Sequence, residues 1–183
     1  MMTKNLVIVE SPAKARTINR YLGDDYEVVA SVGHVRDLPA KTMSVDIENG
    51  FLPEYEIMPG KKTLIQTLKK LANKSDTVYL ATDPDREGEA IAWHVSDLLK
   101  TKHAKKIEGK EIKRAVFYEI SKEAVNKAID EPRNIAMDLV QSQETRRALD
   151  RHFGFSISPL LWRLFPSNNN SAGRVQSPLQ EYG

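Results

Sequence analysis

The chain has 183 residues, of which 40% are hydrophobic and 28% charged, and its formal net charge is +2. This composition is ordinary for a soluble globular protein, and the length suffices for one good hydrophobic core and a smaller appendage. The sequence has no run of roughly eighteen apolar residues and no signal-peptide pattern, so neither a membrane-spanning helix nor export is expected. Because cysteine is absent and only four histidines are scattered along the chain, disulfides and thiolate metal sites are excluded and a zinc site is disfavoured.

Strand-like and helix-like segments alternate along residues 1–132. The apolar and β-branched runs predict strands at 6–10, 26–31, 77–82 and 112–118. Helices are predicted at 12–22, 61–73, from 83 onward and at 121–130. This alternation predicts an α/β fold with a mostly parallel sheet covered on both faces, and right-handed crossovers bring the carboxyl ends of the strands to one edge. Residues 33–60 form a long irregular excursion, and a loop of this length in a compact domain is usually functional.

The stretch D-P-D-R-E-G-E at 83–89 joins the predicted strand 77–82 to the helix that follows it. The carboxylates of Asp83, Asp85 and Glu87 can converge on one hard cation such as magnesium, which usually takes one or two carboxylates together with water and phosphate. The same residues can equally serve the helix alone, with Asp83 as N-cap and Pro84 as the first helical residue. Spacing does not choose between these two interpretations.

A second acid is predicted at the same edge of the sheet. Glu10 ends the strand predicted at 6–10, and its arrival beside the acidic stretch favours a site over simple capping. Lys14 follows one helical turn later, where it can reach a phosphate near the metal. A lysine at such a position is more commonly an ordinary surface residue with no role in a site.

The composition changes after Pro132. Residues 133–183 carry 6 basic and 4 acidic side chains, and all six cations are arginines, which bind phosphate bidentately and stack on bases. Residues 134–153 are predicted to form one helix with Arg147 and Arg151 on a shared face. Local ion pairing with Glu144 and Asp150 is the alternative explanation of this pattern.

Four segments of the chain resemble, in the same order, the bacterial type IA DNA topoisomerase I family. They are V-E-S-P-A-K-A at 9–15, G-H-V-R-D-L-P at 33–39, D-P-D-R-E-G-E-A-I-A-W-H at 83–94 and S-A-G-R-V-Q-S at 171–177. The first and third resemble the core of the Toprim domain, which topoisomerases, primases and some nucleases share. The resemblance implies a Rossmann-like Toprim domain with a mostly parallel sheet at 1–132, followed by a small partial α-helical DNA-binding domain at 133–183.

The resemblance also implies roles for individual residues. The implied Mg²⁺ ligands are Glu10, Asp83, Asp85 and Glu87. The implied catalytic residues are Glu10, Lys14 and Arg86, with Glu10 and Lys14 near the scissile phosphate. The implied DNA contacts are His34, Arg147, Arg151, Trp162, Arg163, Ser171, Ala172, Gly173, Arg174, Val175 and Gln176. Trp162 can alternatively be a core residue.

The function implied by the resemblance is that of the N-terminal part of an isomerase. Such an enzyme relaxes negatively supercoiled DNA by transient single-strand cleavage and strand passage, with magnesium and without ATP, in the bacterial cytoplasm at the nucleoid. None of the six tyrosines lies in a segment that resembles the family's nucleophile motif. We therefore expect the chain to bind single-stranded DNA and metal but to need the remaining topoisomerase domains for relaxation.

Three other functions stay open at this point. The first is a Toprim-type nuclease or primase whose magnesium site acts without a tyrosine. The second is a non-catalytic single-stranded DNA-binding module. The third, suggested by the fold alone, is a phosphate-transferring enzyme of the D-x-D type.

Overall fold

The computed structural model describes residues 5–46, 48, 50–100 and 111–164 of the chain. It divides into two compact units. Unit 1 consists of Met1–Asp37 and Ile57–Val140, and unit 2 consists of Leu38–Glu56 and Gln141–Gly183. Each unit is described by itself.

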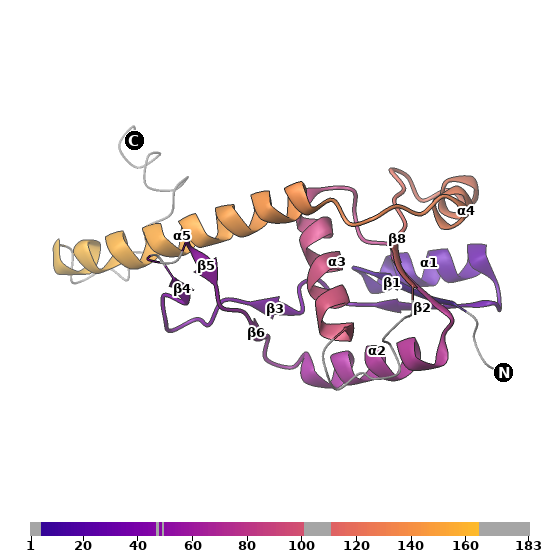
Figure 1. Cartoon of the computed structure of the whole chain (residues 1–183), viewed down its shortest axis with the longest axis horizontal. Coiled ribbons are helices and arrows are strands. Elements are labelled where there is room, and N and C mark those ends of the chain that lie inside the picture. The colour runs from indigo at the N-terminus through magenta and orange to yellow at the C-terminus, as the bar shows by residue number, and fades with distance from the viewer. Residues whose placement is uncertain (1–4, 47, 49, 101–110, 165–183) are drawn as a thin grey trace. The chain divides into compact units, whose positions relative to one another are not determined.

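Unit 1 is built on a four-stranded parallel sheet (Figure 1). Its strands are β1 (Asn5–Val9), β2 (Tyr26–Ala30), β7 (Thr77–Leu80) and β8 (Glu111–Arg114), and their order in the sheet is β2-β1-β7-β8. All three pairings are parallel, which confirms the predicted α/β fold with a mostly parallel sheet. β8 is shorter than the predicted strand 112–118 because its pairing with β7 stops at Leu80 and Arg114.

Four helices cover the two faces of this sheet. They are α1 (Pro12–Leu22), α2 (Lys62–Lys74), α3 (Arg86–Leu99) and α4 (Lys122–Asp130). Alternate residues of β1 enter two separate cores, since successive side chains of a strand point to opposite faces. Leu6 and Ile8 belong to a core with apolar residues of α2 and α3, whereas Val7 and Val9 belong to a core with apolar residues of α1 and α4.

Helix α1 begins and ends as its sequence predicts. The Ser11 side chain accepts a hydrogen bond from the Lys14 backbone N–H at 3.3 Å, and Pro12 is the first helical residue. Gly23 ends the helix at a positive φ of 74°, a conformation that glycine adopts without strain. Because the helix begins at Pro12, directly after the Ser11 cap, Lys14 lies about one helical turn beyond the end of β1.

The centre of the sheet is a topological switch point. β1 and β7 are neighbours, but β2 lies on the far side of β1 and β8 on the far side of β7. Crossovers that diverge in this way leave a crevice at the carboxyl ends of the two central strands, which is where open α/β sheets bind ligands. Glu10 directly follows β1, and Asp83 lies three residues beyond β7.

Unit 2 combines residues 38–56 of the excursion with most of a long helix. The antiparallel strands β4 (Val45–Asp46) and β5 (Leu52–Pro53) belong to this unit, and helix α5 (Met137–Leu164) enters it at residue 141. Leu38, Val45 and Ala148 form its small core. The remaining short strands, β3 (Arg36–Asp37) and β6 (Glu56–Ile57), pair where the chain leaves and rejoins unit 1.

Helix α5 has 28 residues and extends well past the predicted end at 153, with Pro159 inside it. Among the described helices, α5 included, none is long and apolar enough to cross a membrane.

Candidate active site

Three charged side chains meet at the carboxyl ends of β1 and β7. The Lys14 ammonium donates hydrogen bonds to the carboxylates of both Glu10 and Asp83. The Asp83 backbone N–H donates to Glu10 Oε2 at 3.2 Å, which holds the two acids beside each other. The side chains of Glu10, Lys14 and Asp83 are 18%, 20% and 43% exposed, so the cluster is shielded but open to solvent on one side.

The two carboxyl groups of this cluster differ in their affinity for protons. Burial raises the pKa of Glu10, and a side-chain hydrogen bond with the Asp83 carboxyl group raises it further, whereas the bonds from the Lys14 ammonium and the Asp83 N–H lower it. This side-chain hydrogen bond with Glu10 lowers the pKa of Asp83, helped by the Lys14 ammonium. Burial by itself lowers the pKa of Lys14, but the bonds to Asp83 and Glu10 outweigh it and the pKa is raised. With Lys14 charged and both acids ionised, the cluster carries one net negative charge, which favours a further cation.

The start of α3 differs from the predicted one. Asp85, not Asp83, is the N-cap, with extended backbone angles (φ −123°, ψ 176°) and with Oδ1 accepting from the Gly88 N–H at 2.7 Å. The predicted cap at Asp83 with Pro84 as the first helical residue is therefore wrong. The physical reason is that Asp83 is already bound to Lys14 through its carboxylate and to Glu10 through its N–H. Asp85 therefore caps the helix, whereas Asp83 contacts Glu10 and Lys14.

Gly88 allows α3 to approach Asp83 closely. A Cβ atom at Gly88 would lie 2.1 Å from the Asp83 carbonyl oxygen, far inside van der Waals contact. The Thr82 hydroxyl donates to the Gly88 carbonyl at 2.6 Å and fixes the same approach. A side chain at this position would displace the segment that carries Asp83.

The remaining predicted residues of this site lie along the first turn of α3 and on the excursion. His34 Nε2 lies 3.2 Å from Glu87 Oε2, and both side chains are partly exposed. Arg86 is the first residue of α3 and is exposed. The structure thus brings Glu10, Lys14 and Asp83 together and places His34 against Glu87. Over the residues that the structure describes, no group of three or more acidic, histidine or cysteine side chains is arranged to hold a metal ion.

The donor chemistry of the Glu10–Asp83 pair fits magnesium. Both groups are carboxylates, and Mg²⁺ commonly uses one or two carboxylates while water and substrate phosphate complete its octahedron. Asp85 has one oxygen engaged by the cap, and Glu87 is engaged by His34. The structure brings Glu10 and Asp83 together around Lys14, and the set of four metal ligands stays a prediction.

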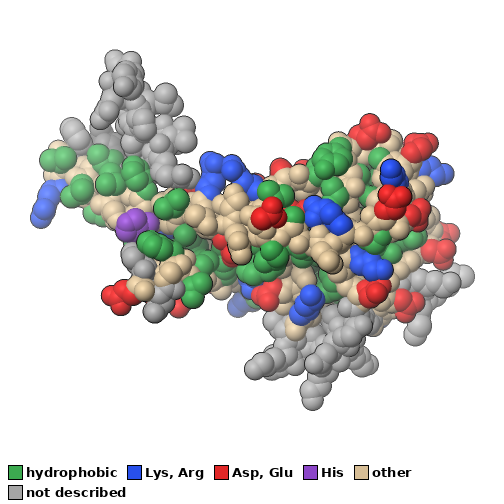
Figure 2. Space-filling view, turned by 45° about the horizontal axis from the view of Figure 1, so that its top comes forward, with side chains coloured by type: hydrophobic (Ala, Val, Ile, Leu, Met, Phe, Trp, Pro, Cys, Tyr) green, Lys and Arg blue, Asp and Glu red, His purple; other side chains and the backbone are tan. Residues whose placement is uncertain are grey.

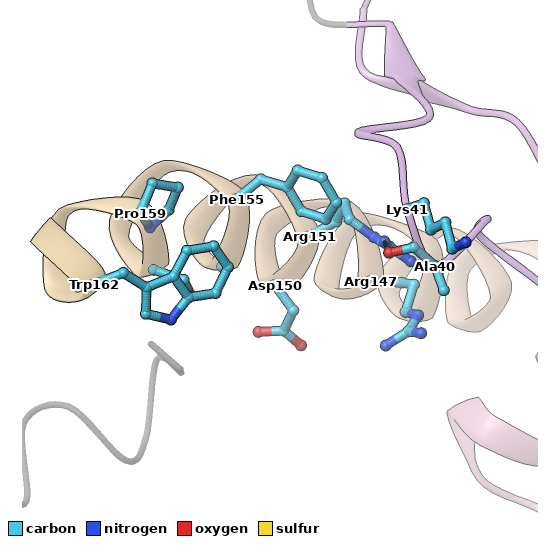
Figure 3. A pocket seen from close by; sticks show the side chains of 10 residues that line it. Ala40, Lys41, Arg147, Asp150, Arg151, Phe155, Pro159 and Trp162 are labelled. Atoms are coloured by element: carbon cyan, nitrogen blue, oxygen red, sulfur yellow. Dashed lines mark hydrogen bonds between the residues drawn. The ribbon is translucent and has the colours of Figure 1, made fainter. Parts of the chain in front are cut away.

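A groove in unit 2 runs along α5 and contains two of the predicted arginines, Arg147 and Arg151 (Figure 3). It has a volume of about 720 Å³ and is lined by Lys41, Arg147, Arg151 and Trp162 among others. Trp162 is 53% exposed, so it does not serve as a core residue in this unit. Figure 2 shows apolar side chains gathered over the C-terminal end of α5.

The arginines of α5 have different surroundings. Arg151 donates to the carbonyls of Leu38, Ala40 and Thr42 at 3.1, 3.3 and 3.4 Å. Its guanidinium also lies 5.2 Å from the centre of the Phe155 ring. Of the two local pairings considered, the one between Arg146 and Asp150 is observed, with Nε 3.9 Å from Oδ2. Arg147 lines the groove, and Arg163 is exposed in the last turn. The predicted contacts at 171–176 lie outside the described residues.

Comparison with family models decides the relationship of the chain. Residues 5–120 match the model described as Toprim domain, and residues 134–180 match the model described as DNA topoisomerase. The chain belongs to the Toprim-containing bacterial topoisomerase I family. The resemblance inferred from its motifs is confirmed.

Individual relatives agree with this assignment. Over 177 residues the chain is 53% identical to DNA topoisomerase 1 of Xylella fastidiosa, in both strain Temecula1 and strain 9a5c. It also resembles the structure of full-length topoisomerase I from Thermotoga maritima, with a TM-score of 0.84 and 46% identity. These matches cover 97% of this chain, but 21% of each Xylella protein and 29% of the Thermotoga chain. The chain spans about a fifth of the length of the curated topoisomerase relatives that it matches.

One part of the candidate site escaped prediction from the sequence. Glu89, the fourth acid of D-P-D-R-E-G-E, is fully buried and pairs with the fully buried Arg114 at 3.0 Å. Glu89 also accepts from Arg133 and from the Ala136 N–H, the latter at 3.0 Å. Arg114 donates to the Asp83 carbonyl at 2.7 Å, so this network supports the backbone of Asp83. The available signal was an arginine within an apolar predicted strand, which requires a buried partner.

Proposed function

We propose that this chain is the part of a type IA DNA topoisomerase that holds the metal ion and a single strand of DNA. The whole enzyme would relax negatively supercoiled DNA by transient single-strand cleavage and strand passage, without ATP and with magnesium, in the bacterial cytoplasm. The main support is the meeting of Glu10, Lys14 and Asp83 at the switch point of the sheet in a chain of this family.

The residues of this cluster fit the handling of a phosphodiester. Lys14 has three N–H donors and can offer one to a phosphate oxygen while it keeps its bonds to the acids. Glu10, whose pKa burial raises, suits a group that gives or takes a proton beside the scissile phosphate. When bound at the Glu10–Asp83 pair, Mg²⁺ would neutralise negative charge on the phosphate. Asp85 and Glu87 would complete the acidic surroundings, and Arg86 would add a cation at the mouth of the site.

The DNA strand would be held by the predicted contacts in both units. His34 would lie against DNA near the cleavage site. In the groove of unit 2, Arg147 would contact phosphate and Trp162 would stack on a base, and Arg163 in the last turn of α5 would add a further phosphate contact. Arg151 would contribute by holding the segment at 38–42 in place as well as by its charge. Residues 171–176, with a glycine and an arginine, would bring backbone N–H groups to phosphate.

We further propose a Toprim domain at 1–132 and a partial DNA-binding domain at 133–183. Residues 38–56 of the excursion are the part of the first segment that belongs to unit 2 in the structure. The six tyrosines of the chain lie outside any nucleophile-like motif, so strand cleavage would require the remaining topoisomerase domains.

Reconstitution tests this proposal. The chain is mixed with the tyrosine-bearing remainder of a close topoisomerase I relative, and relaxation of negatively supercoiled plasmid is followed with and without magnesium. We expect relaxation only when both parts and Mg²⁺ are present. Asp83→Asn should abolish it, whereas Asp76→Asn, at an exposed aspartate beyond α2, should not.

Three outcomes would contradict the proposal in different ways. Failure of relaxation with both parts folded would argue against the assignment of this chain as half of the active site. Nicking or priming of DNA by the chain alone with magnesium would favour the nuclease or primase alternative. If the chain binds single-stranded DNA but Asp83→Asn leaves the activity of the reconstituted mixture unchanged, a non-catalytic module is favoured.

A further inference from the structure

Two of the family-like motifs contact each other through residues that have no role in the proposed function so far. Arg36 of G-H-V-R donates from Nε to Nδ1 of His94 in A-I-A-W-H, at 3.0 Å. Arg36 Nη1 donates to Asp97 Oδ2 at 2.6 Å, and the guanidinium lies 5.3 Å from the centre of the Trp93 ring. We call Arg36, Trp93, His94 and Asp97 the Arg36 clasp. All four residues belong to unit 1.

The clasp depends on the shape of arginine as well as on its charge. Its planar fork bonds two acceptors at fixed separation and lies over an aromatic ring, which a lysine ammonium cannot reproduce. The His94 ring accepts at Nδ1 and must therefore be unprotonated there. Burial, followed by the charge of Arg36, lowers the pKa of His94 to about 3, so the acceptor persists at neutral pH.

The loop before Arg36 is held in a strained conformation. Val32 has φ 57°, unusual for a β-branched residue, and its side chain is 56% exposed. The Lys61 ammonium donates to the carbonyls of Ser31 and Val32. The Gly33 N–H donates to the Glu10 carbonyl at 3.0 Å. The loop is thus tied to the strand end that carries Glu10.

The clasp and the His34–Glu87 contact lie on the same helix. Glu87 and His94 are seven residues apart, so they share one face of α3 at a separation of about 10 Å along its axis. His34 and Arg36 are two residues apart and span about 7 Å when extended. Residues 34–36 therefore run along this face, with His34 against Glu87 and Arg36 against His94.

We propose that Arg36 is a positioning residue that, through its clasp on α3, holds His34 against Glu87 in the place where His34 meets single-stranded DNA. This inference rests on the proposed function, in which His34 contacts the DNA strand. Arg36 itself does not touch the substrate. Its effect on DNA binding passes through His34.

A double-mutant cycle on the 183-residue chain tests the inference. The affinity for a fluorescein-labelled single-stranded oligonucleotide is measured for Arg36→Lys, His34→Ala and the double variant. We expect each single substitution to weaken binding about fivefold, the loss of roughly one hydrogen bond. The double variant should be less than about twofold weaker than His34→Ala alone, because both changes remove the same contact. Arg20→Lys, at an exposed arginine of α1, is the matched control.

A second, milder variant of the clasp keeps the inference testable if Arg36→Lys does not fold. Asp97 is 51% exposed, so Asp97→Asn weakens the clasp without opening the core, and about a twofold loss of affinity is expected. Thermal unfolding is measured for every variant. A fall in Tm with unchanged affinity of the folded protein would show that the clasp is only structural and would overturn the inference.

Other outcomes separate this inference from the proposed function. If Arg36→Lys keeps the wild-type affinity, or if its effect multiplies with that of His34→Ala, Arg36 does not act through His34 and the inference fails while DNA binding stands. If the wild-type chain does not bind the oligonucleotide, the proposed function itself fails and the inference falls with it.

Discussion

Glu89→Gln is the substitution for which the structure makes the sharpest prediction of stability. Glu89 is the only carboxylate that contacts Arg114 among the ion pairs of the described residues, and both side chains are 0% exposed. The change keeps the size of the side chain but leaves a buried guanidinium without its counter-charge. Removing one partner of a buried pair costs about 3–5 kcal/mol. Because Arg114 keeps three carbonyl acceptors, those of Leu80, Asp83 and Ala115, we expect the lower end, about 3 kcal/mol.

Urea unfolding followed by the fluorescence of Trp93 measures this loss in unit 1. The variants are made in a Trp162→Phe background, so that the signal comes from α3 alone. With an m value of about 2 kcal/mol/M, the midpoint should fall by about 1.5 M. Glu87→Gln is the matched control, since Glu87 is 48% exposed two residues earlier on the same helix. Its cost should be about 0.5 kcal/mol.

The comparison between the two glutamates decides the prediction. If Glu89→Gln shifts the midpoint no more than Glu87→Gln, the buried network does not stabilise unit 1. The account of Glu89 and Arg114 as the support of the Asp83 backbone would then be wrong.

Three further predictions concern other parts of the chain. Gly88→Ala should destabilise the fold by about 2–3 kcal/mol and abolish relaxation in the reconstituted enzyme, because the added methyl collides with the Asp83 carbonyl; urea unfolding and the plasmid assay measure both effects. Burial lowers the pKa of His94 from 6.5 to about 3, so the unfolded chain takes up a proton there first as the pH falls. Stability should therefore drop by about 2 kcal/mol between pH 7 and pH 5, and His94→Gln should flatten this dependence in urea unfolding at the two pH values. Arg147→Met should weaken oligonucleotide binding and reduce its salt slope by about 0.7, whereas Arg146→Met, at the neighbouring arginine that faces Asp150, should change both much less; equal effects would exclude a groove contact.

The order of helices and strands in unit 1 could be predicted from local patterns. The apolar run of β1 and the Ser11–Pro12 start and Gly23 end of α1 are written in short stretches of sequence and recur in the structure. Strand ends of a parallel sheet share one edge, so Glu10 and Asp83 could be placed near each other before any coordinates were known.

The roles of the four acids in D-P-D-R-E-G-E could not be assigned from their spacing. Asp83 meets Lys14 from 69 positions away, Asp85 caps α3, and Glu89 is buried against segments 25 and 47 positions further on. Spacing along the sequence predicts which side chains can lie on the same turn of a helix. It does not predict which of them will be buried away from water.

The excursion shows the same contrast between features that local sequence predicts and features that long-range contacts decide. Its length predicted a functional segment, but the place of residues 38–56 in unit 2 with most of α5 depends on contacts such as those from Arg151 to carbonyls 38–42, more than a hundred positions apart. The sequence by itself determined the family, the α/β pattern and the edge of the sheet where the acids gather, because these follow from motifs and local periodicity. Only the tertiary structure decided which acid faces Lys14, which caps a helix and which is buried, since burial and the choice of a partner arise when distant segments pack together.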